Sequence, residues 1–438
     1  MSRVIGVIGL GYVGLPLALA FIQQGYSVIG VDVNEQKIKT LHSKKSYLPD
    51  VSDEAVHISI TGKKLIATSN YARLTEAEAV ILCVPTPLTA NHTPDLSYLL
   101  QVGAALSKVL RQGQLIILES STYPGTTREV LMPLLEQGGL KVGNDIYLGY
   151  SPERINPGNP NYTMEIIPKV VSGITEQCTD KILELYATVF SEVIPVSSPE
   201  AAELTKLLEN SYRFVNISFI NEFAMLCDQL NIDIWEVITA AKTKPYGFSA
   251  FYPGPGVGGH CIPVDPLYLQ WSANRRGANS KFIEYSQAIN LSMPNYIVER
   301  VKDCLGDATL AGKSILVIGV SYKRNIDDVR ESSALNLMTL FMQEGATVLY
   351  HDPYVPEVTI GDCRLKSEEL SAQNLAVADC VVIVTDHSQL PLQLILDHAR
   401  LVYDTRGMTR GYEGKARVVR LGSGLQEQRS VHFLEHGQ

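Results

Sequence analysis

Short apolar runs alternate with amphipathic stretches of helical periodicity along the first 198 residues of the chain. The runs are rich in β-branched residues and lie at Val4–Ile8, Ser27–Val31, Ala79–Val84, Leu115–Glu119, Tyr147–Tyr150, Lys169–Ser172 and Glu192–Pro195. Such an alternation is typical of βα units on a parallel sheet whose strands are covered by helices. The pattern therefore predicts a doubly wound α/β domain over residues 1–198.

A different pattern begins at Pro199, where the spacing of apolar residues stays helical as far as about Ile238. Apolar side chains recur there on more than one face, which is typical of a helix buried between domains or subunits. A loop rich in glycine, proline and aromatic residues follows over 244–266, and helical periodicity then extends to about Leu305. We expect residues 199–305 to form a helical central domain that carries a dimer interface.

The alternation of strands and helices returns after residue 305. The predicted strands of this part are Ser314–Gly319, Thr347–Tyr350, Cys380–Thr385 and Arg400–Asp404. They predict a second doubly wound domain over residues 306–438. The expected fold class is therefore α/β, with two doubly wound Rossmann-like domains joined by a long central helix and a helical connector.

Length, charge and cysteine content narrow the class of protein. A chain of 438 residues needs more than one hydrophobic core, and a formal net charge of -9 argues against nucleic acid or an anionic membrane as a partner. No apolar run reaches the length of about 20 residues that spans a bilayer, and no leader precedes the first strand, so we expect a cytoplasmic protein. Its seven cysteines include no C-x-x-C pair, which predicts reduced thiols.

The first predicted strand leads directly into the run Gly9-Leu10-Gly11-Tyr12-Val13-Gly14, and a helical stretch follows it. In a dinucleotide-binding turn the first glycine makes the tight turn, the second admits the pyrophosphate and the third packs helix against strand. The alternative is a glycine-rich turn that serves packing only. Asp32 ends the second strand, where a carboxylate accepts hydrogen bonds from the ribose hydroxyls and repels a 2′-phosphate. The predicted cofactor is therefore NAD.

Further cofactor contacts are expected at the ends of later strands. Pro85, Thr86 and Thr122 follow two of them, and proline and small hydroxyl residues suit the close passage of a cofactor. Each position by itself is more typical of a turn. Lys37 lies one helical turn into the segment after Asp32, where it would flank the adenosine or remain a solvated lysine.

The glycine-rich loop near the middle of the chain contains a candidate nucleophile. Four glycines within six positions precede Cys261, and Asp265 follows four residues later. Glycines give backbone amides the freedom to converge on an anion, but such loops also link domains, and a free cysteine is usually buried and inert. By spacing alone, the catalytic and structural interpretations of Cys261 stay equally open. No second ligand pair accompanies His260 and Cys261, so we expect no metal site.

Five blocks, through their order and spacing, make the sequence resemble the UDP-glucose/GDP-mannose dehydrogenase family, the nucleotide-sugar 6-dehydrogenases. They are Gly9–Gly14 with Asp32, Ser121–Thr126, Glu203–Asn210, Gly258–Asp265 and Tyr322–Ser332. The resemblance implies an enzyme that oxidises the C6 hydroxyl of a UDP-sugar to a carboxylate with two NAD⁺ and without release of the aldehyde. Cys261 would form a thiohemiacetal and then a thioester, which water cleaves.

The resemblance also implies roles for residues around Cys261. Lys206 and Asn210 lie four apart on a predicted helix, so they share a face and would direct an ammonium and an amide at one oxyanion. Asp265 would act as a general base or orient the hydrolytic water, the alternative being a turn aspartate. Glu153 would handle a proton or water during thioester hydrolysis, and Thr122 would position cofactor and water.

The second doubly wound domain is expected to bind the uridine diphosphate. Its first turn lacks the second and third glycines, so it is a poor site for NAD. The resemblance implies that Lys323 faces the substrate and that Arg330 faces the cofactor or a phosphate. The full set of expected substrate contacts is Glu153, Arg154, Lys206, Asn210, Tyr252, Gly254, Gly256, Gly258 and Lys323.

The run Pro152-Glu153-Arg154-Ile155-Asn156-Pro157-Gly158-Asn159 is similar to the N-acetylhexosamine branch of the family. It predicts UDP-N-acetylglucosamine as the substrate, with UDP-N-acetylmannosamine and UDP-glucose as alternatives. Two other function classes stay open: a β-hydroxyacid-type dehydrogenase that transfers one hydride, and a nucleotide-binding protein without turnover. We expect a homodimer or a higher homo-oligomer.

Overall fold

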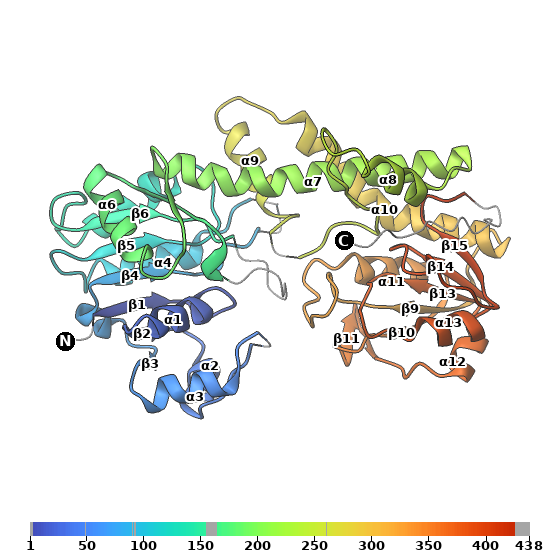
Figure 1. Ribbon diagram of the computed structural model, residues 1–438, viewed down its shortest axis with the longest axis horizontal. Coiled ribbons are helices and arrows are strands. Elements are labelled where there is room, and N and C mark those ends of the chain that lie inside the picture. Colours follow the sequence, from blue (N-terminus) through green and yellow to red (C-terminus); the bar gives the residue numbers. More distant parts are fainter. Residues whose placement is uncertain are drawn as a thin grey trace. The chain divides into compact units, whose positions relative to one another are not determined.

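The computed structural model describes residues 3–48, 50–89, 91, 93–154, 164–259 and 261–424. The chain divides into two compact units (Figure 1). Unit 1 consists of Met1–Asn210 and Val264–Asn279, and unit 2 consists of Ser211–Pro263 and Ser280–Gln438. Both units take part of the expected central domain, and the boundaries at 198/199 and 305/306 stay a prediction.

Unit 1 is built on an eight-stranded sheet with the order β3-β2-β1-β4-β5-β6-β7-β8. Its strands are β1 (Val4–Ile8), β2 (Ser27–Val31), β3 (Leu65–Thr68), β4 (Ala79–Leu82), β5 (Leu115–Leu118), β6 (Tyr147–Tyr150), β7 (Lys169–Gly173) and β8 (Val193–Pro195). All neighbours are parallel except β6 and β7. The strand order reverses between β1 and β4, and ligands bind beyond the carboxyl ends of strands at such a switch point.

Both faces of this sheet are covered by packed side chains. On β5, Ile117 belongs to one hydrophobic core and its neighbours Ile116 and Leu118 belong to another, because successive residues of a strand point to opposite faces. The helices of unit 1 are α1 (Gly14–Gln23), α2 (Glu35–His42), α3 (Asp53–Thr61), η1 (Tyr71–Glu76), α4 (Ser97–Leu106), η2 (Thr126–Leu131), α5 (Met132–Glu136), η3 (Met164–Ile166), α6 (Glu176–Tyr186) and α9 (Asp265–Asn274).

Unit 2 contains a parallel five-stranded sheet with the order β10-β9-β13-β14-β15, and a separate antiparallel pair, β11 and β12. Its strands are β9 (Ser314–Ile318), β10 (Thr347–His351), β11 (Glu357–Ile360), β12 (Cys363–Lys366), β13 (Cys380–Ile383), β14 (Leu401–Asp404) and β15 (Arg417–Arg420). Its helices are α8 (Ile234–Ala241), α10 (Lys281–Leu305), α11 (Ser333–Gln343), α12 (Ala372–Val377) and α13 (Leu392–His398). The two sheets, parallel except for the β6–β7 pair, confirm the α/β fold class with two doubly wound parts.

The sequence pattern missed β3, β15 and the β11–β12 pair. These strands have four residues each, and β3 and β15 lie at the edges of their sheets. An edge strand is exposed along one side, so it does not need the continuous apolar run of a buried parallel strand. The predicted strands that begin at Ala79, Leu115 and Glu192 were also one or two residues too long.

Helix α7 (Pro199–Leu230) is the long helix that contributes to both units (Figure 1). Within this single chain one face of the helix is exposed, so the expected burial between domains or subunits stays a prediction for that face. Its exposed apolar residues are Leu204, Leu208, Tyr212, Phe219, Phe223, Leu226 and Leu230. Their spacings of three, four and seven residues place them on one face, and we call this face the α7 stripe.

Candidate functional site

The glycine-rich turn follows β1, as expected, and its three glycines differ in their surroundings. A Cβ on Gly9 would lie 2.5 Å from the Cys83 carbonyl oxygen, and one on Gly14 would lie 1.9 Å from the Gly9 carbonyl oxygen. Close packing therefore explains Gly9 and Gly14. Gly11 has no described heavy atom within 4 Å of its Cβ position, so packing does not explain it, whereas the approach of a pyrophosphate does.

Asp32 lies at the end of β2 beside this turn. Its Oδ2 accepts a hydrogen bond from the Leu10 backbone N–H at 2.8 Å, and its Oδ1 accepts one from the Asn34 N–H at 2.9 Å. Lys37 Nζ lies 3.4 Å from Oδ2. A carboxylate has about four acceptor positions, so these contacts leave capacity for ribose hydroxyls.

Tyr47, which sequence reasoning did not find, supports the same turn. Its hydroxyl donates to the Leu10 carbonyl oxygen, and burial, together with the Asp32 charge, raises the pKa of Tyr47 above its usual range. The residue comes from the connection between α2 and α3, where no sequence motif marks it. Two other residues of the run Gly9–Gly14 were expected to contact the cofactor. The Tyr12 side chain is exposed, and Val13 is half-buried.

The ends of β4 and β5 meet, as the sequence predicted for a shared edge of the sheet. Thr86 is buried, and its Oγ1 donates to the Ser121 carbonyl oxygen at 2.6 Å. Thr122 is also buried and donates to Thr126 Oγ1 at 2.5 Å. Pro85 is exposed. Both expected cofactor threonines therefore lie at the edge where β1 carries the glycine turn.

Glu203 on α7 fixes the segment that follows Thr122. Its carboxylate accepts hydrogen bonds from Gly125 N–H at 2.6 Å, Thr127 N–H at 2.9 Å and Thr127 Oγ1 at 2.7 Å. Burial raises the pKa of Glu203 to about 7, against these three hydrogen bonds, which favour the charged form. The sequence signal for this residue was an acidic side chain three positions before Lys206 on an apolar helix, and no role was assigned to it.

Four of the expected catalytic residues lie in unit 1 and form two contacts. Lys206 Nζ donates to the Glu153 carbonyl oxygen at 2.6 Å. Asn210 Nδ2 donates to Asp265 Oδ2 at 2.6 Å. Both Lys206 and Asp265 are buried. Burial raises the pKa of Asp265, whereas the Lys206 charge and the Asn210 hydrogen bond lower it.

In this cluster the second carboxylate oxygen of Asp265, Oδ1, accepts no hydrogen bond from the described residues. This oxygen is buried. A buried acceptor without a donor costs free energy, so an unpaired oxygen next to an ammonium and an amide is typical of a site that receives a ligand or water.

Arg154, an expected substrate contact, forms an ion pair with Glu209 at 2.6 Å and donates to the Pro168 carbonyl oxygen at 2.7 Å. The rest of the run that suggested the sugar, Ile155 to Asn159, lies outside the described residues, as does His260.

The loop with Cys261 belongs to unit 2, and its glycines are explained by close packing. A Cβ on Gly258 would lie 2.6 Å from the Glu331 carbonyl oxygen, and one on Gly259 would lie 2.6 Å from the Tyr322 ring. Gly256 has φ 128°, in the region that side chains other than glycine rarely adopt. The Cys261 side chain is half-buried.

The expectation that the amides of this loop converge on an anion needs correction. Gly254 N–H donates to Asn221 Oδ1 at 2.9 Å, Val257 N–H donates to Asn290 Oδ1 at 2.6 Å, and Gly259 N–H donates to the Arg330 carbonyl oxygen at 3.0 Å. Three amides of the loop are therefore used within unit 2. Gly258 and Gly259 let the loop pack closely against Tyr322 and Glu331.

Unit 2 also contains a cavity of about 360 Å³ with aromatic and cationic walls. It is lined by Trp235, Tyr252, Pro253, Arg324, Asp386, Arg406, Gly407 and Arg410. The rings of Trp235 and Tyr252 stack with centroids 6.1 Å apart. Aromatic rings and guanidinium groups are suited to a base and a diphosphate.

Arg406 is the residue of this cavity that sequence reasoning missed. Its guanidinium lies against Gly254, where a Cβ would approach it to 2.5 Å, and its Nε donates to the Val384 carbonyl oxygen at 2.8 Å. Burial lowers the pKa of Arg406. The available signal was its position directly after the predicted strand Arg400–Asp404, at the edge where such sheets bind ligands.

Lys323 and Arg330, the other cationic residues expected at the site, lie on the segment 321–331 of unit 2. The Lys323 carbonyl oxygen accepts a hydrogen bond from Ser321 Oγ at 2.8 Å. Arg330 is exposed and forms an ion pair with Asp328 at 2.6 Å. Their contacts with substrate and cofactor stay a prediction.

Metal sites and membrane-spanning helices are absent from the described part of the chain. Among these residues there is no group of three or more His, Cys, Asp or Glu placed to hold a metal ion. No helix of the same residues is long and apolar enough to cross a membrane.

Comparison with known proteins gives matches in all three parts of one family. Residues 3–190 match its NAD binding domain, residues 200–292 its central domain and residues 316–411 its UDP binding domain. Protein CapL of Staphylococcus aureus is 39% identical over 80% of this chain and 82% of the relative. NDP-N-acetyl-D-galactosaminuronic acid dehydrogenase of Ralstonia nicotianae is 34% identical over 93% of this chain and 96% of the relative.

A solved structure has the same fold. The UDP-D-ManNAc dehydrogenase of Pyrococcus horikoshii superposes with a TM-score of 0.88 at 31% identity, over 97% of this chain and 100% of the other. The cofactor prediction is confirmed by the NAD binding domain, and the open space at Gly11 and the carboxylate of Asp32 fit that cofactor. With its NAD-binding, central and UDP-binding parts all present, the chain belongs to the UDP-glucose/GDP-mannose dehydrogenase family and is an NAD-dependent UDP-sugar 6-dehydrogenase.

Proposed function

We propose that this enzyme oxidises the C6 hydroxyl of a UDP-N-acetylhexosamine to the uronic acid through a covalent intermediate on Cys261. One alcohol, one water and two NAD⁺ give one carboxylate, two NADH and three protons. NAD⁺ accepts the hydride in each oxidation step. The observation that carries the proposal is the buried cluster of Lys206, Asn210 and Asp265, in which Asp265 Oδ1 has no partner among the described residues.

Each residue of the cluster has a task that follows from its chemistry. Asp265 Oδ1 accepts a proton from the C6 hydroxyl or from the hydrolytic water, and its raised pKa suits a general base. The Lys206 ammonium and the second N–H of Asn210 stabilise the oxyanion that forms at C6. The Glu153 carbonyl oxygen holds the ammonium in place.

Cys261 supplies the covalent step. Its thiolate adds to the C6 aldehyde, so that the C–S bond forms while the carbonyl π bond becomes the oxyanion of a thiohemiacetal. The second hydride leaves this adduct and gives a thioester, and water then breaks the C–S bond and releases the thiolate and the carboxylate. Retention of the aldehyde on sulfur explains how two oxidations take place at one site.

The uridine diphosphate is assigned to unit 2. The cavity beside Tyr252 offers Arg406, Arg324 and Arg410 for phosphate oxygens and stacked rings for the base. Lys323, on the segment that contacts the cysteine loop, would bind the sugar side of the diphosphate.

Three epimers are candidates for the N-acetylhexosamine. The structure of the Pyrococcus horikoshii protein is named for UDP-D-ManNAc, and the Ralstonia nicotianae relative for an N-acetylgalactosaminuronic acid. Their similar identities to this chain, 31% and 34%, favour the N-acetylhexosamine class over any one epimer. The name of the Pyrococcus horikoshii protein favours UDP-N-acetylmannosamine, whereas the run from Pro152 to Asn159 favours UDP-N-acetylglucosamine.

The test is a steady-state assay of the purified protein with UDP-N-acetylglucosamine, UDP-N-acetylmannosamine, UDP-N-acetylgalactosamine and UDP-glucose. We expect the highest kcat/KM for one N-acetylhexosamine and two NADH per uronic acid. A higher kcat/KM for UDP-glucose would overturn the substrate class. One NADH per product would favour the single-hydride alternative, and cofactor binding without turnover would favour a non-catalytic protein.

The α7 stripe is proposed as the contact with a second copy of the chain. Seven apolar side chains of one helix face are exposed in the single chain, which is unusual for a surface that stays in water. An isologous pair would bury the stripe of both copies at once. The cytoplasmic location stays a prediction from the sequence.

A further inference from the structure

The sheet of unit 2 repeats the backbone contacts of the cofactor turn in unit 1. Gly319 N–H donates to the His351 carbonyl oxygen at 2.8 Å, as Gly9 N–H donates to the Val31 carbonyl oxygen at 2.8 Å. In both units the aspartate that follows the second strand of the repeat accepts a hydrogen bond from the residue after that glycine. Asp352 Oδ2 accepts from Val320 N–H at 2.7 Å, as Asp32 Oδ2 accepts from Leu10 N–H.

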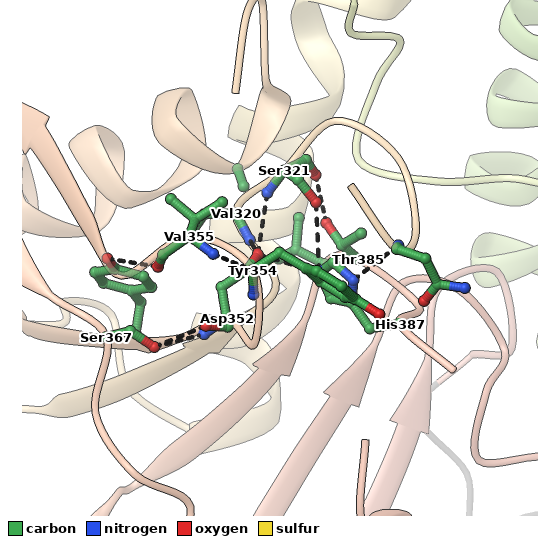
Figure 2. Close-up of polar contacts among 12 residues, drawn as sticks. Val320, Ser321, Asp352, Tyr354, Val355, Ser367, Thr385 and His387 are labelled. Carbon is green, nitrogen blue, oxygen red and sulfur yellow. Dashed lines mark hydrogen bonds and ion pairs between the residues drawn. The ribbon is translucent and has the colours of Figure 1, made fainter. Parts of the chain in front are cut away.

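The two aspartates differ in what else they bind. Asp352 is completely buried, and His387, also completely buried, lies with its Nε2 3.1 Å from Asp352 Oδ2 (Figure 2). Asp352 Oδ1 accepts from the N–H groups of Tyr354 and Val355. Burial opposes ionisation of Asp352, but the hydrogen bonds from His387 and Val320 outweigh it and lower the pKa of Asp352.

The second ring nitrogen of His387 faces the backbone of another segment. Asn325 N–H donates to His387 Nδ1 at 3.0 Å. A backbone N–H is only a donor, so Nδ1 must be the acceptor and carry no proton. The ring is therefore the neutral tautomer with its proton on Nε2, which donates to Asp352. This arrangement makes His387 a bridge between Asp352 and the segment 321–325.

The same segment has further anchors on the side of His387. Thr385 Oγ1 donates to the Ser321 carbonyl oxygen at 2.7 Å (Figure 2). Asn325 Oδ1 accepts from Ser388 N–H and from Ser388 Oγ, each at 3.0 Å. Asn325 has φ 61°, a left-handed conformation that needs support from neighbouring groups. The contacts thus bracket Lys323, which lies between the two anchored residues.

The other side of the segment contacts the loop of Cys261. The Tyr322 ring lies so close to Gly259 that a Cβ there would be 2.6 Å from the ring, and Glu331 is equally close to Gly258. Cys261 follows Gly259 by two residues. The position of Tyr322 therefore limits where the cysteine loop lies within unit 2.

We propose that His387, oriented by Asp352, is a positioning residue that fixes the segment 321–325, and with it Lys323 and the loop of Cys261, for the UDP-sugar. This inference rests on the proposed function of Lys323 and Cys261. His387 itself is completely buried and acts through the Asn325 backbone. Loss of the Nδ1 acceptor leaves the Asn325 N–H unpaired and frees that end of the segment. Loss of the Nε2 donor removes the contacts of the ring with Asp352 and, at 3.4 Å, with Ser321 Oγ, but Asp352 Oδ2 still accepts from the Ser321 N–H at 3.2 Å and keeps this anchor of the segment.

Two substitutions of His387 separate these functions. In His387→Asn the amide oxygen takes the place of Nδ1 and still accepts from Asn325 N–H. In His387→Gln the amide reaches the place of Nε2, so the contact with Asp352 is kept and the Nδ1 acceptor is lost. We expect His387→Gln to raise the KM for the UDP-sugar about tenfold to a hundredfold, as for an unpaired backbone donor. His387→Asn should stay within about threefold of the wild type.

Three further measurements make the result specific. The KM for NAD⁺ should stay the same in both variants, because the glycine turn and Asp32 belong to unit 1 and His387 anchors residues 321–325 rather than Arg330. His398→Asn, at an exposed histidine of α13, is the matched control. If His387→Gln does not fold, Asn325→Gly serves in its place, since glycine adopts φ 61° and keeps the N–H donor but loses the anchor to Ser388. A severalfold rise in the KM for the UDP-sugar is expected there.

The inference is overturned if His387→Gln and His387→Asn have equal KM values for the UDP-sugar. It is also overturned if the KM for NAD⁺ changes together with the KM for the UDP-sugar. A wild-type enzyme that oxidises no UDP-sugar would refute the proposed function instead. In that case calorimetric binding of UDP to the wild type and the two variants still tests the role of His387.

Discussion

The Asn210 amide donates to Asp265 Oδ2 at 2.6 Å, so one carboxylate oxygen is used by the protein and the other is left to the site. Oδ1 is buried without a hydrogen-bond partner among the described residues. The two residues are 55 positions apart in sequence, on α7 and at the start of α9. Their contact orients the carboxylate and favours its ionised form, against burial, which raises the pKa of Asp265.

Asp265→Asn should lower kcat by about 10² to 10⁴, the range for removal of a general base. Because burial raises the pKa of Asp265, kcat/KM of the wild type should fall as the pH drops through that pKa. Asn210→Ala removes a hydrogen bond that favours the ionised form, so this acidic limb should move to higher pH. An unchanged limb in Asn210→Ala, measured from pH 5 to 9, would contradict the assignment.

Cys261→Ser should reduce turnover by at least about a thousandfold, as expected for loss of a nucleophile. NAD⁺ binding, measured by fluorescence titration, should not change. A serine ester forms less readily and hydrolyses more slowly than a thioester, so mass spectrometry should detect a trapped adduct of the sugar nucleotide. Cys363→Ser, at an exposed cysteine, is the control. Full activity of Cys261→Ser would exclude the covalent route.

Glu203→Gln tests the pH dependence of stability. The pKa of Glu203 in the folded state, about 7, lies above its ordinary value of 4.5. Between pH 4.5 and 7 the Glu203 carboxyl is therefore protonated in the folded state and ionised in the unfolded state. The wild type should therefore gain stability relative to Glu203→Gln as the pH falls from 8 to 5, by up to about 3 kcal/mol.

Glu200→Gln is the matched control for this measurement. Glu200 is on the same helix, and although burial opposes ionisation, its hydrogen bond with Arg128 lowers the pKa of Glu200. The stability of the wild type relative to Glu200→Gln should stay nearly constant as the pH falls from 8 to 5, because a carboxylate with a lowered pKa loses its contribution only below about pH 4.5. Parallel curves of Tm against pH for the two variants would contradict the role of Glu203.

Asp32→Asn should reduce the preference for NAD⁺ over NADP⁺ by at least about tenfold, because a like-charge contact with the 2′-phosphate costs several kcal/mol. The asparagine oxygen can still accept from the Leu10 N–H, so the turn should stay folded, while the part-buried Asn34 N–H loses its acceptor at a modest cost in stability. The ratio of kcat/KM for the two cofactors measures the effect. Glu35→Gln, an exposed carboxylate of α2, should leave that ratio unchanged.

Phe219→Asp introduces a charge into the α7 stripe, where the side chain is 53% exposed. If the stripe is a dimer contact, the variant should be monomeric by light scattering at a concentration at which the wild type is dimeric. Arg213→Asp changes charge on α7 away from the stripe and should leave the mass unchanged. A wild type that is monomeric throughout would refute the interface.

The sequence by itself determined the features that are local along the chain. The glycine turn after β1 and Asp32 after β2 lie within one βαβ unit, so periodicity and spacing were sufficient to predict the fold class and NAD. The five blocks, in their order, were sufficient for the family. Buried parallel strands gave continuous apolar runs, whereas the short edge strands β3 and β15 contain only three and two consecutive apolar residues.

The tertiary structure alone decided which distant residues meet. Glu203 and Thr127 are 76 positions apart, and His387 and Asp352 are 35 apart. No sequence period relates such residues, because their contacts depend on how helices and strands pack. The same packing explains the glycines before Cys261: they admit Tyr322 and Glu331, where their sequence suggested an anion cradle.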